Sequence, residues 1–171
     1  MKKILLWAIV LIIFGGVTLM AKSDSEKIKI YDATLKKEVL VDRIAKSYEE
    51  WKKILPADVY EITTKKGTER PFSCSLNSVK EEGLFKCVRC GTDLFISGNK
   101  FDSGTGWPSF FNPVSSLNIS TAQDNSIPFS PRVEVLCARC GSHLGHVFDD
   151  GPPPTGKRYC INGKALRFVE R

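Results

Sequence analysis

Cys87-Val-Arg-Cys90-Gly91 and Cys137-Ala-Arg-Cys140-Gly141 are two near-identical turns, and they decide the fold of this chain. Each C-x-x-C turn lets two sulfurs converge on one ion, and two such turns supply the four thiolates of a closed, tetrahedral structural zinc site. The 46 residues that separate Cys90 from Cys137 exceed the usual zinc-ribbon interval of roughly 15–20 residues. A whole sheet must therefore fold back between the two turns.

The same four cysteines allow two other interpretations. In an oxidising compartment they would form a pair of disulfides, and a single C-x-x-C turn can also be redox-active. Two matching turns that each end in Cys-Gly favour zinc, with one ion per chain. Such a site acts as a clamp that contributes folding free energy rather than chemistry.

Short apolar stretches, separated by Gly, Pro, Asn, Asp and Ser, surround both turns. This pattern is typical of short antiparallel strands joined by long loops. We therefore expect a mainly β domain. The predicted strands are residues 84–88, 93–96, 133–136, 146–148 and 166–169.

A hairpin and a short helix are predicted upstream of these strands. Residues 28–31 and 36–41 would pair as the two strands of the hairpin. Ser47 and Glu50 form a capping box, because the Ser side chain can bond the N3 amide while Glu reaches back. Pro56 ends the helix that follows. Its apolar face is expected to hold Tyr48, Trp51 and Leu55.

The N-terminus has the layout of a secretory signal. Lys2 and Lys3 precede an uncharged, mostly apolar run over residues 4–21. That run is also just long enough to span a bilayer of roughly 30 Å if it is never cut. We expect export to the periplasm or another extracytoplasmic space, with inner-membrane contact only through this run. The expected layout is a signal peptide or anchor at 1–21, an extension at 22–45 and the folded domain at 46–171.

Charge and composition argue against a nucleic-acid-binding protein. The net charge is +6, but the basic residues are interspersed with acidic ones and form no stripe with interleaved aromatics. The 42% hydrophobic content is that of a globular chain with a real core. A modest charge that promotes solubility is the better explanation.

Cys160 belongs to neither turn and has polar neighbours at alternate positions. Arg158 lies two residues before it, on the same side of an extended strand, and is expected to lower the pKa of the thiol. Asn162, on the same face, offers an amide that would orient a ligand or a carboxyl group. The alternative is a buried structural cysteine.

The only two histidines of the chain, His143 and His146, lie three residues apart beside the second turn. Because four thiolates already serve the metal, we expect the imidazoles to handle protons near pH 7. Trp107 is followed by a rigid proline that would hold the indole at a pocket wall, where it would suit an apolar, partly positive group. Ordinary surface or core roles are the alternative for all three.

Taken together, these segments resemble the type B methionine sulfoxide reductases, which act on the R epimer at sulfur. The resemblance extends in family order from roughly residue 51 to residue 168. It implies a mainly β fold of two antiparallel sheets, with a Cys₄ zinc site opposite the active site. The matching motifs are Gly67-Thr68-Glu69-Arg70-Pro71-Phe72, both cysteine turns, Gly106-Trp107-Pro108-Ser109-Phe110, residues 143–152 and Arg158-Tyr159-Cys160-Ile161-Asn162.

The resemblance also implies roles for individual residues. The Cys160 thiolate would attack the sulfoxide sulfur while a protonated neighbour, a histidine, donates to the oxygen. Methionine would leave and Cys160 would remain as a sulfenic acid. A thioredoxin-like thiol reductant would then regenerate it, in repair of oxidised exported proteins. The implied catalytic set is Cys160, His143, His146, Arg158, Asn162 and Asp150, with Trp107 packed on the substrate methyl group.

One position departs from the commonest family pattern. Many relatives carry a resolving cysteine at the position of Thr105, and threonine cannot form that disulfide. Some family members use a cysteine upstream instead. Cys74 is the one cysteine without another role, so it is the candidate resolving residue, unless it is a spare thiol.

Two rival functions remain at this point. A non-catalytic secreted zinc-knuckle binding module explains the four turn cysteines but leaves Cys160, both histidines and Trp107 without a role. A thiol–disulfide oxidoreductase would use a C-x-x-C pair in catalysis, hold no zinc and stay active without Cys160.

Overall fold

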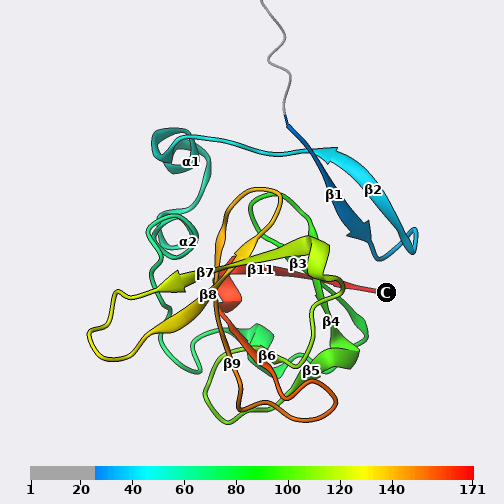
Figure 1. Cartoon of the computed structure of the whole chain (residues 1–171), viewed down its shortest axis with the longest axis vertical. Helices are drawn as coiled ribbons and strands as arrows, with labels where there is room; N and C mark the ends of the chain where they lie inside the picture. Colours follow the sequence, from blue (N-terminus) through cyan, green and yellow to red (C-terminus); the bar gives the residue numbers. More distant parts are fainter. Residues whose placement is uncertain (1–25) are drawn as a thin grey trace, which may run out of the picture.

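The computed structural model describes residues 26–171, and the predicted signal peptide or anchor at residues 1–21 lies outside them. Within the described part the chain folds into antiparallel sheets and two short helices (Figure 1), so the prediction of a mainly β fold is confirmed. The predicted boundaries of the extension and the folded domain stay predictions. No helix within residues 26–171 is long and apolar enough to cross a membrane.

The largest sheet has six strands in the order β5-β6-β10-β9-β8-β7, and a second sheet has the order β11-β3-β4. In the first sheet these strands are β5 (Lys100–Phe101), β6 (Ser109–Phe110), β7 (Ile119–Asp124), β8 (Arg132–Cys137), β9 (His143–Phe148) and β10 (Arg158–Ile161). In the second they are β3 (Gly83–Cys87), β4 (Asp93–Ile96) and β11 (Leu166–Glu170). Every predicted strand overlaps an observed one, although Lys36 and Val88 at the predicted ends lie in turns, and β5, β6 and β7 were not predicted.

The core lies between these two sheets. Phe85 and Phe95 project from the three-stranded sheet onto Phe110 of β6, with ring centroids 4.9 and 4.3 Å from that ring, and all three are fully buried. On β10, Ile161 points into this core. Because side chains alternate along a strand, Cys160 is directed to the opposite face of the sheet.

The N-terminal extension forms the predicted hairpin, β1 (Lys27–Asp32) and β2 (Lys37–Asp42). Hydrogen bonds join β1 and the turn after it to Asn118, Asp93 and Arg171, and further contacts lie near one of the cysteine turns. Ile44 donates its amide to the carbonyl oxygen of Arg139 at 2.9 Å, and Arg139 Nε donates to the carbonyl oxygen of Asp42 at 3.1 Å. The end of the hairpin therefore also contacts the second cysteine turn, at the residue between Ala138 and Cys140.

The capping box is present as predicted, with Ser47 and Glu50 bonded to each other's backbone amides at the start of α1 (Tyr48–Ile54). Trp51 is buried as expected, but Tyr48 is exposed. Pro56 ends α1 and at once begins a second helix, α2 (Ala57–Thr63), which was not predicted. Short 3-10 turns η1 (Ser75–Ser78), η2 (Ser97–Asn99), η3 (Ser116–Asn118) and η4 (Gly163–Ala165) complete the described elements.

Candidate active site

Cys160 is centred between two directly opposite neighbours in the six-stranded sheet. Its register partners are His146 on β9 and Ser109 on β6. Side chains of directly opposite residues in antiparallel strands project from the same face and lie close together. A cavity of about 140 Å³ opens on this face. Its walls include Trp107, Arg132, His146, Phe148, Cys160 and Asn162.

Gly145 allows β9 to lie this close to β10. A Cβ atom on Gly145 would be 2.0 Å from the carbonyl oxygen of Cys160, which no real side chain can tolerate. The residue also has a φ of +156°, a conformation that L side chains rarely adopt. The glycine between the two histidines therefore sets the distance between His146 and Cys160.

Arg158 acts on Cys160 in the predicted direction, but burial has the larger effect. Burial raises the pKa of the Cys160 thiol, while the Thr105 hydroxyl and the charge of Arg158 lower it less. Asp150 accepts two hydrogen bonds from the Arg158 guanidinium, both 2.8 Å long, and so offsets part of its charge. The guanidinium also stacks on Phe148, 4.5 Å from the ring centroid. These effects favour the neutral thiol form of Cys160 over a preformed thiolate.

Glu69 holds two of the predicted cavity residues, Trp107 and Asn162, in place. Trp107 Nε1 donates to the Glu69 carbonyl oxygen at 3.1 Å, and the Glu69 amide donates to Asn162 Oδ1 at 3.1 Å. The buried Glu69 carboxylate in turn accepts the amides of Gly163 and Lys164, at 2.5 and 3.0 Å. Asn162 Nδ2 also donates to the Leu144 carbonyl oxygen at 3.2 Å. The Asn162 amide is thus fixed largely by backbone.

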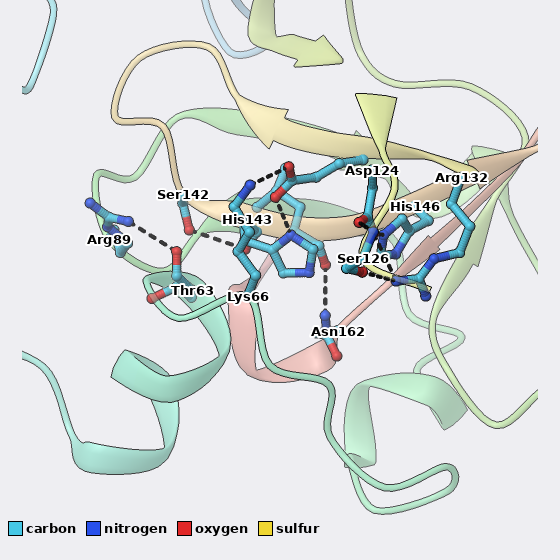
Figure 2. A network of polar contacts seen from close by, with 12 residues as sticks. Thr63, Lys66, Arg89, Asp124, Ser126, Arg132, Ser142, His143, His146 and Asn162 are labelled. Carbon is cyan, nitrogen blue, oxygen red and sulfur yellow. Dashed lines mark hydrogen bonds and ion pairs between the residues drawn. The ribbon is translucent and has the colours of Figure 1, made fainter. Parts of the chain in front are cut away.

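His146 is oriented by a carboxylate from the edge strand β7. Its Nε2 lies 2.7 Å from Asp124 Oδ2, and Arg132 donates to the same oxygen at 2.7 Å (Figure 2). Hydrogen bonds from Ser126, followed by the one from His146, hold the pKa of Asp124 well below its usual range. The carboxylate is therefore ionised, and it fixes the proton of His146 on Nε2.

His143 has the same arrangement with different partners. Its Nδ1 lies 2.7 Å from Glu134 Oε1, and Lys66 Nζ donates to the other carboxylate oxygen at 2.7 Å. His143 does not line the cavity of Cys160, although its ring centroid is 5.5 Å from that of His146. Burial lowers the pKa of His143, which outweighs the opposite effect of Glu134. The ring is therefore neutral near pH 7.

Thr105 occupies a position from which its side chain approaches Cys160. Its Oγ1 lies 4.0 Å from Cys160 Sγ. Cys74 is half-buried and packs on the loop just after β10, since its Sγ is 2.2 Å from where a Cβ of Gly163 would be. Both Cys74 and Cys160 are free thiols in this structure.

The four turn cysteines converge as their spacing predicts. Their sulfur atoms all lie within 4.8 Å of one another, with Cys90 Sγ 3.5 Å from Cys137 Sγ and Cys87 Sγ 3.7 Å from Cys140 Sγ. A tetrahedron with Zn–S bonds of about 2.3 Å has sulfur–sulfur edges of about 3.8 Å. The donor set therefore fits one tetrahedral ion. Gly91 and Gly141 adopt φ values of +75° and +64° as the turns close.

Comparison with known proteins agrees with this geometry. The model of the SelR domain matches residues 55–170. The chain is 56% identical to the peptide methionine sulfoxide reductase MsrB of Methanosarcina barkeri, over 73% of this chain and 87% of that protein. It is 49% identical to the MsrB of Pseudomonas syringae pv. syringae, over 77% of this chain and 99% of that protein.

This chain belongs to the MsrB family. The resemblance on which the sequence analysis relied is thereby confirmed. A chloroplast member, peptide methionine sulfoxide reductase B1 of Arabidopsis thaliana, is also 56% identical, over 71% of this chain and 60% of that protein.

In this MsrB family member the partners of the two histidines were not predicted from the sequence. Asp124, Arg132 and Glu134 were not singled out, and Glu69 appeared only as part of a motif. One signal was available, because charged residues at positions 132 and 134 alternate with apolar ones in a strand that otherwise reads as core. The contact of Glu69 with residues more than ninety positions away left no such local signal.

Proposed function

We propose that this chain is a peptide-methionine (R)-S-oxide reductase that returns R-epimer methionine sulfoxide in peptides and proteins to methionine. The observation that carries the proposal is the cavity in which Cys160 and His146 are register partners, with Trp107 on the wall. An indole face suits a methyl group beside a polarised sulfur. Membership in a family whose named relatives are methionine sulfoxide reductases supports the same reaction.

In the proposed reaction Cys160 Sγ attacks the sulfoxide sulfur, and a histidine provides the proton that the sulfoxide oxygen needs. A transient bond forms between the two sulfurs; as the oxygen passes to Cys160 Sγ, the S–O bond of the substrate and the sulfur–sulfur bond both break. The oxygen ends on Cys160 as a sulfenic acid and methionine leaves as a thioether. One thiol and one sulfoxide thus become one sulfenic acid and one thioether, so atoms and electrons balance.

Cys74 is proposed to resolve this sulfenic acid. Attack by the Cys74 thiol would release water and leave a Cys74–Cys160 disulfide, which a thioredoxin-like thiol reductant would reduce. The packing of Cys74 on Gly163, three residues after Cys160, supports this role. Disulfide formation needs the Cα atoms of Cys74 and Cys160 within about 7 Å of each other.

Cys87, Cys90, Cys137 and Cys140 are proposed to hold one structural zinc ion. A closed Cys₄ set leaves no open position for substrate, so the ion would supply folding free energy only. Arg89, inside the first turn, lies 3.7 Å over the Trp51 ring and donates to the Thr63 carbonyl oxygen at 3.1 Å. These contacts connect the turn to both helices.

We further propose that the protein is exported and repairs oxidised proteins outside the cytoplasm. The support is the sequence of residues 1–21, with two lysines ahead of an apolar run. Cell fractionation with N-terminal sequencing of the mature protein tests the proposal. Recovery of the intact chain in the cytoplasmic fraction would overturn it.

The decisive experiment offers separated R and S epimers of a methionine sulfoxide peptide to the full chain and to Cys160→Ser, with dithiothreitol as reductant. Because dithiothreitol reduces a sulfenic acid directly, the outcome does not depend on Cys74. We expect turnover of the R epimer alone, and none by the variant. A folded chain that reduces neither epimer would refute the enzyme assignment and favour a binding module.

A further inference from the structure

Two carboxylate–cation pairs support the two histidines, and the two pairs lie in different surroundings. Asp124 and Arg132 hold His146 at the wall of the Cys160 cavity. The pair that holds His143 is farther from that cavity. Lys66 and His143 line a separate cavity of about 170 Å³, and the Lys66 side chain is 63% exposed, whereas Glu134 is buried.

The hydrogen bonds of Glu134 define the proton position on His143. One carboxylate oxygen accepts from Lys66 and the other faces His143 Nδ1, each at 2.7 Å. A carboxylate that is paired with an ammonium group accepts hydrogen bonds only, so Nδ1 of the imidazole must carry the proton. In the neutral ring Nε2 is then a bare acceptor.

That Nε2 atom is buried and has no hydrogen-bond partner among the described residues. Figure 2 shows this nitrogen on the side of the ring where Asn162 and His146 lie, away from the hydrogen bond on Nδ1. Both of those residues line the Cys160 cavity. A buried acceptor without a partner costs free energy, so it is expected to be satisfied by a proton-bearing group that enters the site.

We propose that Lys66 and Glu134 are positioning residues that lock His143 as the Nδ1–H tautomer and so present its Nε2 as a proton acceptor beside the Cys160 cavity. The inference rests on the proposed function, in which the Cys160 thiol must lose its proton before attack. Nε2 of His143 accepts that proton, directly or through one water, and the imidazolium that results returns it to the oxygen that leaves the substrate sulfur. Neither positioning residue touches the substrate.

The electrostatic surroundings of His143 give the two residues opposite effects on its pKa. Glu134 raises the pKa of the ring by its hydrogen bond and charge, and Lys66 lowers it by its charge. Loss of Glu134 charge should therefore lower the pKa further, and loss of Lys66 charge should raise it. The charged and titratable groups around the ring are Glu134 on β8, His146 on β9, Lys66 after α2 and, around the adjoining cavity, Lys46, Tyr48, Arg89 and Cys140.

Nuclear magnetic resonance of the imidazole nitrogens tests the proposal without turnover. The chain has only two histidines, so the full chain labelled with ¹⁵N-histidine and freed of any histidine tag gives signals from two rings, each with one Nδ1 and one Nε2 resonance. His143→Gln identifies the signal of His143. We expect the wild-type signal to report protonated Nδ1 and bare Nε2 at pH 7. A ring with protonated Nε2, or equal tautomers, would overturn the proposal.

Three variants separate positioning from a merely structural role. Glu134→Gln should add the second tautomer and lower the titration midpoint of His143, whereas Lys66→Met should raise that midpoint. Lys66→Arg should restore the wild-type value. Lys65→Met is the matched control, because Lys65 lies over the rings of Tyr48 and Tyr60 instead of on Glu134. If the midpoints and tautomers of Glu134→Gln and Lys66→Met match those of wild type, the positioning role of Lys66 and Glu134 is refuted.

Kinetics then distinguish failure of the positioning role of Lys66 and Glu134 from failure of the proposed function. We expect Lys66→Met to lower kcat about tenfold at pH 7 with little change in KM, which is less than the roughly 10²–10⁴-fold effect of a proton-transfer group itself because Lys66 acts only through Glu134. If neither the wild type nor any variant reduces sulfoxide while the His143 signal responds as expected, the proposed function fails and the positioning role stands. If wild type and variants turn over normally and the His143 signal does not respond to the substitutions, the positioning role fails and the proposed function stands.

Discussion

Thr105 Oγ1 lies 4.0 Å from Cys160 Sγ and closes a chain of hydroxyl groups beneath the candidate nucleophile. Ser103 Oγ is 2.8 Å from both Thr105 Oγ1 and Ser109 Oγ, and Ser109 is the β6 register partner of Cys160. A side chain at position 105 is thus fixed by its neighbours and directed at the sulfur. The position is suited to a disulfide, but the residue that occupies it has no sulfur.

We therefore predict that Thr105→Cys, made in a Cys74→Ser background, provides an alternative resolving cysteine. After one turnover without reductant, peptide mapping should find a disulfide between the introduced cysteine and Cys160. Turnover with a thioredoxin-like protein as reductant is expected to be lost in Cys74→Ser alone. In the double variant its rate should recover to within about threefold of wild type, since the geometry needs only small adjustment. A persistent Cys160 sulfenic acid, trapped by dimedone, would contradict the prediction.

Arg158 and Asp150 should shift the pKa of Cys160 in opposite directions. Because the Arg158 charge lowers that pKa, Arg158→Met should raise it and slow alkylation of Cys160 at neutral pH. Because the Asp150 charge raises it, Asp150→Asn should speed alkylation. Changes of roughly three- to tenfold correspond to half a unit to one unit of pKa. Mass spectrometry of the Cys160 peptide, alkylated by iodoacetamide across a pH series, measures both, and a shift of the same sign in both variants would refute the account.

Glu69→Gln should destabilise the fold and disturb the cavity together. The buried carboxylate accepts two backbone amides, and a glutamine that turns its NH₂ group toward one of them leaves that amide unpaired. We expect a loss of about 2–3 kcal/mol in the free energy of unfolding, measured in urea. Glu61→Gln, at an exposed position on α2, is the control and should change it by less than about 0.5 kcal/mol.

Metal removal should unfold the protein rather than only inactivate it. We expect one zinc ion per chain by elemental analysis, and none in Cys137→Ser. Loss of the ion should lower the free energy of unfolding by about 5 kcal/mol or more, because binding of structural zinc is coupled to folding. Cys74→Ser should keep its zinc and its melting temperature. A metal-free chain that melts like the wild type would show that the four sulfurs are not a folding clamp.

Local patterns in the sequence were enough for the elements that depend on near neighbours. The capping box of Ser47 and Glu50 spans three residues, and both cysteine turns are contained in five. The alternation of Arg158 and Cys160 correctly placed both on one face of a strand. Helix α2 was missed because seven residues after a proline are too few to establish a helical period.

Partners that meet only in the folded state could not be predicted in this way. Asp124 is 22 residues from His146, and the pairing of β7, β8 and β9 alone brings the two together. The pKa of Cys160 illustrates the same limit. Its sequence neighbour Arg158 predicted a lowered value, but burial, which depends on the whole fold, raised it.

The N-terminal hairpin has a practical consequence for handling the molecule. Its contacts with the body include Arg139, between Cys137 and Cys140, and in Figure 1 it stands apart from β6 and β9, which flank Cys160. A bead or sensor surface coupled ahead of residue 26 would therefore hold the molecule by the end that carries the four-cysteine cluster and leave the cavity facing the medium. The length of the linker would then determine how large an oxidised protein the immobilised enzyme can bind.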